Sequence, residues 1–299
     1  MARPTAGTPA MRRTASKIFP VFQILNFIFR IISVPQGYNK LLVPPAVGGK
    51  RKLDLNMSVI LVNILEIDIV GGLFRTRHVL DRQWYDPSLS YRNLDKDYRI
   101  NLVSEEEEGE IWFPKMVFEN QPSEEDTITY VHNQVYALMR NPENKFDPVG
   151  VAEIDNTNIY AGDLNKHYLR KEFSTVWTCE FNMKWYPFDT QECKMQYKIV
   201  NKYSDFAALV PENLSYVGPK DLTEYTVKGY MMCKVKIGPY DGVEVRVQLG
   251  RPLISNIMIV FIPCIILLVI CHLANVFEND YLDMVIGTNL TALLVLGTL

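Results

Sequence analysis

Apolar and polar residues alternate along much of the chain before Arg251, and this period of two predicts β-strands. The clearest run extends from Trp177 to Trp185, where every second residue is apolar and the residues between them are polar. The alternation resumes from Cys193 to Ile199, after a turn that contains the sequence YPFD. Two half-buried strands on either side of a short turn are therefore expected in this part of the chain.

Other segments predict further strands of the same sandwich. The run Asn56 to Val70 is long, apolar and rich in β-branched residues, which predicts a strand buried on both faces. In the next predicted strand, Arg75 and Arg77 share a face. Strand-like runs at 127–139 and 149–154 follow, separated by the turn-forming sequence NPENKFDP.

The last predicted pair of strands is a hairpin formed by residues 225–237 and 243–249. Its tip contains Tyr240 between two glycines, so we expect a mobile turn. Cys233 lies on the first of these strands and is predicted to be a buried free thiol. The stretch 199–222 between Cys193 and the hairpin is predicted to be irregular.

Two apolar segments follow the β region. Leu253 to Val276 contains 24 residues without Asp, Glu, Lys or Arg, which is enough to span a bilayer as a helix kinked at Pro263. A second apolar helix is predicted over 282–299. Gly287, Thr291, Leu294 and Thr298 form a stripe on it, which suits either close helix packing or, in five copies, a pore lined by hydroxyl groups.

The amino-terminal residues have the pattern of a leader. Three basic side chains precede an apolar run that begins at Ile18, as in a secretory signal, although Arg30 interrupts the run. A removed signal and an uncleaved amphipathic segment both fit residues 1–33. The predicted organisation is therefore a leader at 1–33, a β-sandwich at 36–250 and a transmembrane region at 251–299.

Composition excludes several classes of protein. The 299 residues are 48% hydrophobic and 22% charged, with a formal net charge of -3, so a nucleic-acid partner is not expected. His132 and His167 stand alone in the sequence, and no Cys/His spacing suits zinc, so no metal or cofactor is predicted. No nucleophile, base and orienting group occur in a recognisable arrangement, which argues against an enzyme.

Three motifs together carry a resemblance to a known family. Thirteen residues separate Cys179 from Cys193, and the sequence WYPFD lies between them. Trp84, Asp86 and Leu89 form a W-x-D-x-x-L pattern, and a W-x-P segment begins at Trp112. The chain thus resembles the Cys-loop receptors, the pentameric neurotransmitter-gated ion channels. The sequence GRPLISNIMIVFIP is similar to the first transmembrane helix of their arthropod branch, which includes proton- and zinc-gated chloride channels.

The resemblance implies a disulfide between Cys179 and Cys193 in an immunoglobulin-like extracellular β-sandwich. The 15-residue ring that it closes contributes roughly 3 kcal/mol in the chain-entropy model. Such a bond requires an oxidising compartment. A simple staple between neighbouring strands, without any role in signalling, is the alternative interpretation.

The resemblance also implies a binding site between subunits. An aromatic box there suits a cationic amine, whereas arginines suit a carboxylate, and the sequence leaves both possibilities open. Lys115 replaces an aspartate that is frequent in the family. The predicted ligand contacts are Trp112, Phe118, Tyr197, Tyr203 and Tyr240 from one subunit and Arg75 or Arg77 from its neighbour.

Coupling of ligand binding to the pore is expected where the disulfide loop and Arg251 meet the membrane helices, and Leu294 aligns with the gate leucine of the family. Two observations about ion selectivity disagree. Asp283 at the pore mouth favours cations, whereas the arthropod branch that the sequence resembles includes chloride channels. We expect the channel to pass anions. The predicted coupling residues are Tyr186, Pro187, Phe188, Asp189 and Arg251.

The predicted partners are a small agonist, a permeant inorganic ion, the lipid bilayer of the plasma membrane and four further subunits. Asn56 and Asn213 begin glycosylation sequons in the predicted extracellular part. A cation channel, a secreted ligand-binding homologue and a truncated, non-conducting subunit remain as alternatives.

Overall fold

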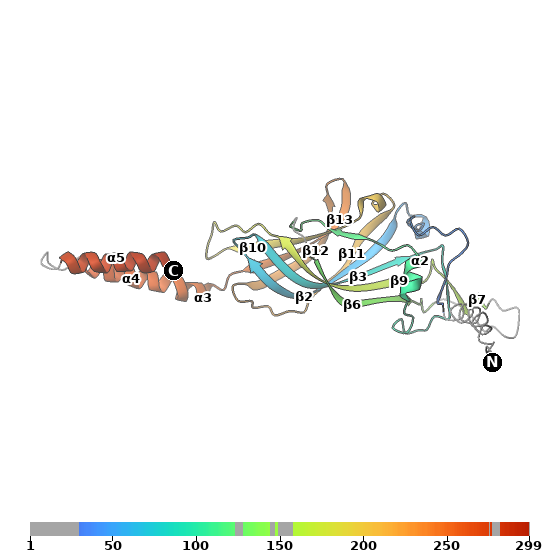
Figure 1. Cartoon of the computed structure of the whole chain (residues 1–299), viewed down its shortest axis with the longest axis horizontal. Helices are drawn as coiled ribbons and strands as arrows, with labels where there is room; N and C mark the ends of the chain where they lie inside the picture. Colours follow the sequence, from blue (N-terminus) through green and yellow to red (C-terminus); the bar gives the residue numbers. More distant parts are fainter. Residues whose placement is uncertain are drawn as a thin grey trace, which may run out of the picture.

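The computed structural model describes residues 30–122, 128–143, 147–148, 158–274, 276 and 282–298. Most of the predicted leader, to residue 29, and the predicted strand at 149–154 lie outside these residues. The described chain forms an elongated β-sandwich with a helical region at one end (Figure 1). The predicted class, a β-sandwich followed by helices, is confirmed.

The larger layer is a five-stranded sheet in the order β11, β2, β3, β9, β6. Strand β11 runs parallel to β2, and the other neighbours are antiparallel. The bounds of these strands, in sheet order, are Ala207–Tyr216, Leu53–Asp68, Leu73–Tyr85, Lys166–Thr178 and Ile128–Met139.

The facing layer is a four-stranded antiparallel sheet in the order β12, β13, β10, β5. Its strands have the bounds Thr226–Ile237, Tyr240–Gly250, Thr190–Ile199 and Met116–Phe118. The predicted hairpin is confirmed, but its turn is shorter than expected, because Tyr240 already pairs with Ile237 across Gly238 and Pro239. Tyr240 therefore begins a strand instead of forming a mobile tip.

A small sheet covers the end of the sandwich away from the helices in the order β1, β4, β8, β7. Its strands have the bounds Ile32–Ser33, Ser90–Arg92, Asn158–Ala161 and Asp147–Pro148, and short 3-10 helices occupy Val47–Gly49 (η1) and Asn201–Tyr203 (η2). Strand β1 falls inside the predicted leader, yet Ile32 is buried and pairs with Tyr91. The leader boundary at residue 33 therefore cuts into the folded domain.

Helix α2 (Glu105–Glu110) holds strand β1 in place. Ser104 and Glu107 form a capping box, in which each side chain accepts a hydrogen bond from the backbone N–H of the other residue. The buried Glu107 carboxylate also accepts hydrogen bonds from the amides of Ile31 and Ile32, at 2.8 and 3.0 Å. The acidic segment thus forms a helix, and its one buried carboxylate fixes the position of β1.

The core lies between the two larger sheets. The apolar residues at alternate positions of β13 are all fully buried there, namely Val243, Val245, Val247 and Leu249. Strand β2 was expected to be buried on both faces, but only every second residue from Leu53 to Leu61 is fully buried. The prediction was wrong because polar side chains such as Asn56 and Ser58 occupy the outer face.

Strand β11 contradicts the prediction of an irregular segment at 199–222. Pro211 and Glu212 interrupt any regular alternation, and the pairing of β11 with β2 shifts register between Pro211 and Asn213. A strand that contains a bulge has no continuous period of two, so its sequence pattern is weak. Cys233 on β12 was predicted to be buried, but it is only partly buried.

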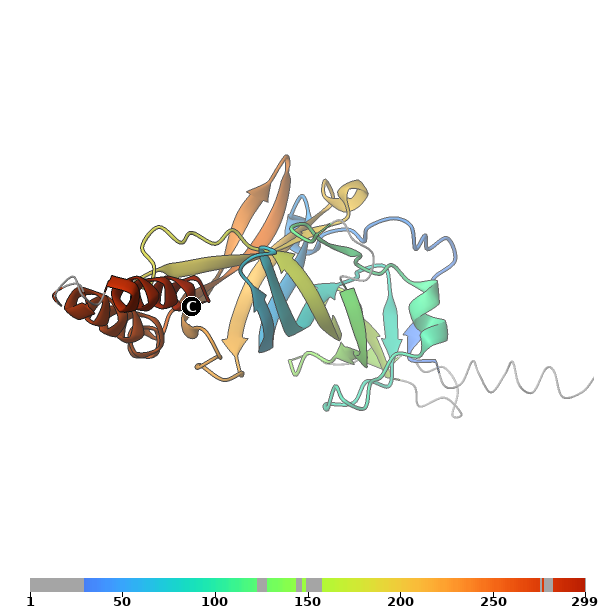
Figure 2. The same cartoon turned by 60° about the vertical axis from the view of Figure 1, so that its left-hand side comes forward.

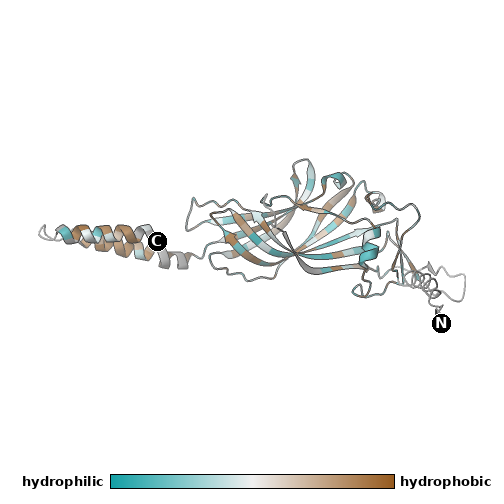
Figure 3. Cartoon of the chain, viewed as in Figure 1, coloured by the Kyte–Doolittle hydropathy of each residue, from teal (hydrophilic) through white to brown (hydrophobic). Residues whose placement is uncertain are grey.

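The apolar segments after Pro252 form a helical hairpin beyond the end of the sandwich (Figures 1 and 2). The predicted helix Leu253 to Val276 is present as three successive segments, and a second helix runs back beside them. Figure 3 shows the concentration of apolar residues in this hairpin. The helical segments are α3 (Leu253–Asn256), the π-helix η3 (Ile257–Phe261), α4 (Ile262–Ala274) and α5 (Leu282–Thr298). Taken singly, none of the described helices combines the length and the apolar character needed to cross a membrane.

Candidate functional site

The most distinctive polar cluster lies where the sandwich meets the helices. Arg251 follows the last strand, and its Nε donates to Asp189 Oδ1 at 2.8 Å and to Oδ2 at 3.1 Å. The Arg251 and Asp189 side chains are only 7% and 2% exposed. Two segments 62 residues apart in sequence are therefore joined by a buried ion pair, immediately before α3.

Aromatic and polar groups complete the surroundings of the Arg251 guanidinium. Its Nη2 donates to the Tyr225 hydroxyl at 2.6 Å and lies 3.3 Å from Met183 Sδ. The guanidinium carbon lies 4.6 Å from the ring centroid of Tyr225 and 5.0 Å from that of Tyr186. Burial raises the pKa of the Tyr225 hydroxyl, so this group stays protonated at neutral pH.

The loop that supplies Asp189 is closed by the predicted disulfide. Cys179 and Cys193 are bonded, with their Cα atoms 5.1 Å apart. Pro187 follows Tyr186 through a cis peptide bond. The disulfide anchors both ends of the loop on the sandwich, so the loop position and the Arg251 pair are linked.

The tip of this loop presents aromatic side chains to solvent. Trp185 is 70% exposed and Phe188 is 71% exposed, and the Lys184 ammonium lies 5.8 Å from the Trp185 ring centroid. These side chains lie close in sequence to Asp189, whose partner Arg251 precedes the helices. The predicted coupling residues thus form one contiguous region at the helical end of the sandwich.

The predicted ligand contacts do not form a single open site. Phe118 and Tyr197 are buried in the core, with ring centroids 5.4 Å apart, and both pack against Trp177. Trp112 and Tyr203 are also buried, and their rings meet edge to face at 6.0 Å. Of the five aromatic residues, only Tyr240 is partly exposed.

The next residues along the chain after two of the buried aromatics are charged, and of them Glu119 is exposed whereas Lys198 is itself buried. Glu119 follows Phe118, Lys198 follows Tyr197, and the two side chains form an ion pair. The Lys198 ammonium lies 5.7 Å from the Tyr240 ring centroid. Sequence reasoning missed Glu119 and Lys198, although the alternation of β10 already places Lys198 opposite Tyr197.

Further charges surround Tyr240. Asp241 Oδ2 lies 3.6 Å from Lys52 Nζ, and Oδ1 lies 3.4 Å from Lys236 Nζ. Slight burial acts to raise the pKa of the Asp241 carboxyl, but the hydrogen bond from Lys236 and the nearby lysine charges lower it below its usual value. The outer surface near Tyr240 is therefore charged and not an aromatic box.

Arg75 and Arg77 lie on the other sheet, on the outer face of β3. Arg75 Nε is 3.4 Å from Glu66 Oε2, and Arg77 pairs with the buried Glu172. Neither arginine lies on the sheet that carries Tyr240. The two predicted halves of a binding site therefore lie on different sheets of this chain.

The predicted pore stripe is divided between two faces of α5. Gly287 and Thr291 line a cavity of about 450 Å³ against Leu267 and Ile270 of α4. Leu294 is 70% exposed and points away from the core of the hairpin. Asp283 is exposed in the first turn of α5, and Thr298 is its last residue.

The two predicted glycosylation asparagines lie on neighbouring strands. Asn56 on β2 donates from Nδ2 to Glu212 Oε1 at 3.1 Å, and Asn213 on β11 is exposed. In the register of these strands Asn213 stands opposite Ser58, the third residue of the Asn56 sequon. Their modification stays a prediction.

Two histidines are buried in the sandwich. His167 lies between the hydroxyls of Tyr91 and Tyr136, at 2.7 and 2.8 Å, and stacks on Trp84 with the ring centroids 4.9 Å apart. Burial lowers the pKa of His78 and of His167 to about 3, so both are neutral at pH 7. Within the described ranges, no three His, Cys, Asp or Glu side chains are grouped to hold a metal ion.

Comparison with known protein families adds an independent observation. Residues 30–145 match the family model described as neurotransmitter-gated ion-channel ligand binding domain. The match supports a member of the Cys-loop receptor family. It covers less than half of the chain and ends before the disulfide loop. Asp86 lies within the matched residues, where it accepts from the Ser88 amide at 3.0 Å and holds the turn after Trp84.

Proposed function

We propose that this protein is a subunit of a pentameric channel of the plasma membrane, opened by a small extracellular ligand. The family match supports a ligand-gated channel subunit in general. The observation that carries the proposal is the buried pair between Asp189 of the disulfide loop and Arg251. A ligand that moves the sandwich would act on the helices through this pair, because Arg251 directly precedes Pro252 and α3.

The ligand binds between subunits, on the surface around Tyr240. Exposed Glu119 and partly exposed Tyr240 face the ligand, and buried Lys198 contacts both of them, since Phe118 and Tyr197 are in the core. Arg75 and Arg77 of the adjacent subunit supply the other side. Charged groups on both sides suit an ionic or zwitterionic ligand better than an aromatic box would.

The channel passes anions, with Leu294 as its gate. The resemblance of residues 250–263 to the proton- and zinc-gated chloride channel branch supports this assignment. Cation conduction is the second candidate, because exposed Asp283 in the first turn of α5 would form a ring of carboxylates in a pentamer.

The test is expression in oocytes with current recording during application of acid, zinc, amines and amino acids. We expect a ligand-evoked current whose reversal potential follows the chloride gradient. A reversal potential that follows sodium would replace the anion assignment by the cation candidate. Absence of any current, with the protein demonstrated at the cell surface by biotinylation, would overturn the proposal.

A matched pair of variants tests the coupling step. Arg251→Gln removes the buried pair and should abolish the evoked current. Arg99→Gln changes an exposed arginine whose partner, Asp97, is also on the surface, and it should leave the current unchanged. Equal currents in the two variants at equal surface expression would argue against signalling through Arg251.

A further inference from the structure

Two neighbouring turns at the helical end of the sandwich expose apolar side chains. The turn between β2 and β3 carries Val70, which is fully exposed. The amide of Cys179, at the start of the disulfide loop, donates to the carbonyl of Gly72 in this turn at 2.8 Å. On the disulfide loop itself, Trp185 and Phe188 are 70% and 71% exposed. Apolar groups are thus presented to the surroundings at the end from which the helical hairpin extends (Figures 1 and 2).

The disulfide loop holds its aromatic residues in a fixed arrangement. The buried Gln191 side chain accepts from the Asn182 amide at 2.8 Å and donates to the Asn182 carbonyl at 3.0 Å. Within the tip, the Phe188 amide donates to the Trp185 carbonyl at 2.6 Å. Because the loop is braced in this way, both aromatic side chains are held in the exposed position, where contact with water is unfavourable.

The exposed apolar surface continues onto the helical hairpin. Arg251 pairs with Asp189 of the loop, and the chain enters α3 two residues later. Ile254 in α3 is 80% exposed, and apolar side chains remain exposed along both α4 and α5. The next step rests on the proposed function, which places this hairpin in a bilayer. The tip of the disulfide loop then lies where the hairpin enters the membrane surface.

The side chains at the tip have the properties that suit the boundary between lipid headgroups and acyl chains. Trp185 combines a large ring with one N–H donor, and such rings are enriched at membrane interfaces. Lys184 is exposed, and its ammonium lies 5.8 Å from the Trp185 ring centroid. A long basic side chain of this kind reaches a headgroup phosphate while its methylene groups stay near apolar surface. Phe188 adds apolar area without a polar group that needs a partner.

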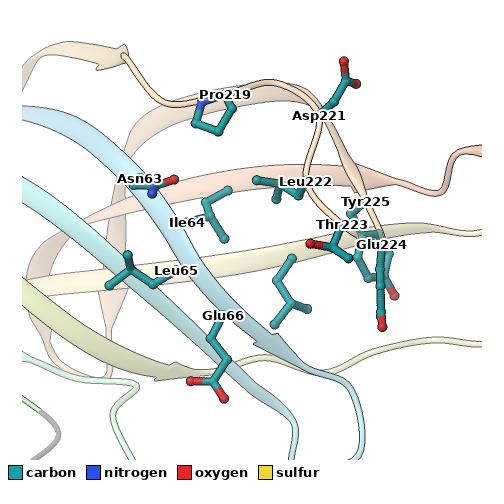
Figure 4. A pocket seen from close by; sticks show the side chains of 11 residues that line it. Asn63, Ile64, Leu65, Glu66, Pro219, Asp221, Leu222, Thr223, Glu224 and Tyr225 are labelled. Atoms are coloured by element: carbon teal, nitrogen blue, oxygen red, sulfur yellow. The ribbon is translucent and has the colours of Figure 1, made fainter.

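Carboxylates at the same end of the sandwich decide which headgroups fit. A pocket of about 410 Å³ is lined there by Glu66, Glu224 and Tyr225, among other residues (Figure 4). None of the described residues that line it is basic. These carboxylates repel a strongly anionic surface, whereas a zwitterionic headgroup offers them its ammonium and offers Lys184 its phosphate. The charges therefore favour a zwitterionic phospholipid.

We propose that the tip of the disulfide loop is a phospholipid contact site. The Trp185 and Phe188 side chains are seated among the headgroup and glycerol atoms of a zwitterionic bilayer, and the Lys184 ammonium pairs with a lipid phosphate. Because Asp189 belongs to the same loop, this contact acts on the segment that holds Arg251. Coverage of the tip by protein, either another segment of this chain or a second subunit, is the competing arrangement.

The four tryptophans of the chain make the contact measurable by fluorescence. Trp84, Trp112 and Trp177 are at most 1% exposed, so Trp185 alone is open to a collisional quencher. The purified full chain is placed in phosphatidylcholine nanodiscs, with or without bromine atoms on the acyl chains near the headgroup. We expect the brominated lipid to quench the emission of Trp185, and aqueous iodide to quench it less than a tryptophan in water.

Two results of this measurement would overturn the proposal. Protection of Trp185 from both quenchers would show that protein covers it. Quenching by iodide alone would show that it faces water.

Three variants supply the controls. Trp185→Phe keeps an aromatic ring at the tip and should abolish the lipid-dependent quenching; persistence of the quenching would refute the assignment. In that background, Leu41→Trp places a tryptophan at a position that is 65% exposed near α2, and it should respond to iodide and not to brominated lipid. Lys184→Gln should reduce the quenching of Trp185 by brominated lipid, and an unchanged value would refute the pairing with phosphate.

The channel and the lipid contact fail in different ways. An evoked current together with a Trp185 that only iodide quenches would refute the lipid contact and leave the proposed function standing. Quenching by brominated lipid without any evoked current would leave the lipid contact standing and refute the channel. Protein that does not co-elute with the nanodiscs would refute the membrane location, and the lipid contact with it.

Discussion

The two ends of the sandwich bury polar groups in opposite ways. At the end near α2, His167 is neutral and lies between two tyrosine hydroxyls. At the helical end, Arg251 and Asp189 are buried as an ion pair. A neutral network needs no compensating charge, whereas each half of a buried ion pair depends on the other. The first arrangement holds strands together, and the second makes the position of one segment depend on another.

The largest effect should come from breaking the ion pair. Arg251→Met leaves the Asp189 carboxylate buried without its cation, and this should lower the free energy of unfolding by about 3–5 kcal/mol. Denaturant unfolding of the purified protein measures the loss. A loss of this size would show that the helical end depends on a paired buried charge, unlike the neutral network around His167.

The double variant Asp189→Asn/Arg251→Met is the control for this effect. It removes both charges, so most of the lost stability should return although the contact itself is absent. If the double variant is as unstable as Arg251→Met alone, then the packing around Tyr225 and Tyr186, and not the unpaired charge, carries the effect.

A change of pH should act on the neutral histidines. Their folded pKa of about 3 lies below the usual value of 6.5, so the unfolded chain binds more protons between these two pH values. The stabilisation is thus complete above pH 6.5 and is lost as pH falls toward 3. From pH 7 to pH 5 the loss should be about 2 kcal/mol for each of His78 and His167.

The variant His78→Leu isolates one of the two contributions. His78 Nε2 is buried without a partner among the described residues, so its replacement leaves no new unpaired group on that side. Between pH 7 and pH 5 the free energy of unfolding of this variant should therefore change with pH about half as steeply as that of the natural protein. An unchanged slope would show that His78 is already protonated or accessible in the folded state.

Several features of both ends could be predicted from sequence. The alternation of Val243 to Leu249 is a local pattern and predicted the strands of the hairpin correctly, although not the length of its turn. The disulfide between Cys179 and Cys193 was implied by resemblance and is confirmed. Arg251 was placed with the disulfide loop by resemblance, and the structure brings its side chain to Asp189.

Other features depend on contacts between distant segments and were not predictable. Whether Phe118 or Glu119 faces outward is fixed by the pairing of β5 with β10, and the sequence of a three-residue strand is too short to reveal it. The burial of His167 requires Tyr91 and Tyr136 from two other strands. Strand β11 required its parallel neighbour β2, since its own pattern contains a bulge.

The smallest effect should come from the helix cap at the end near α2. Ser104 Oγ accepts from the Glu107 amide at 3.3 Å, so Ser104→Ala should cost about 1 kcal/mol of stability. The same cap orients the Glu107 carboxylate, which receives the amides of Ile31 and Ile32. Hydrogen exchange of these two amides should therefore accelerate in the variant, whereas exchange near Asp189 should not change. Ser104→Asp keeps a capping acceptor and should restore slow exchange at Ile31 and Ile32. If Ser104→Ala instead accelerates exchange equally at both ends, the sandwich opens as one unit, and the independence of its two polar clusters would have to be given up.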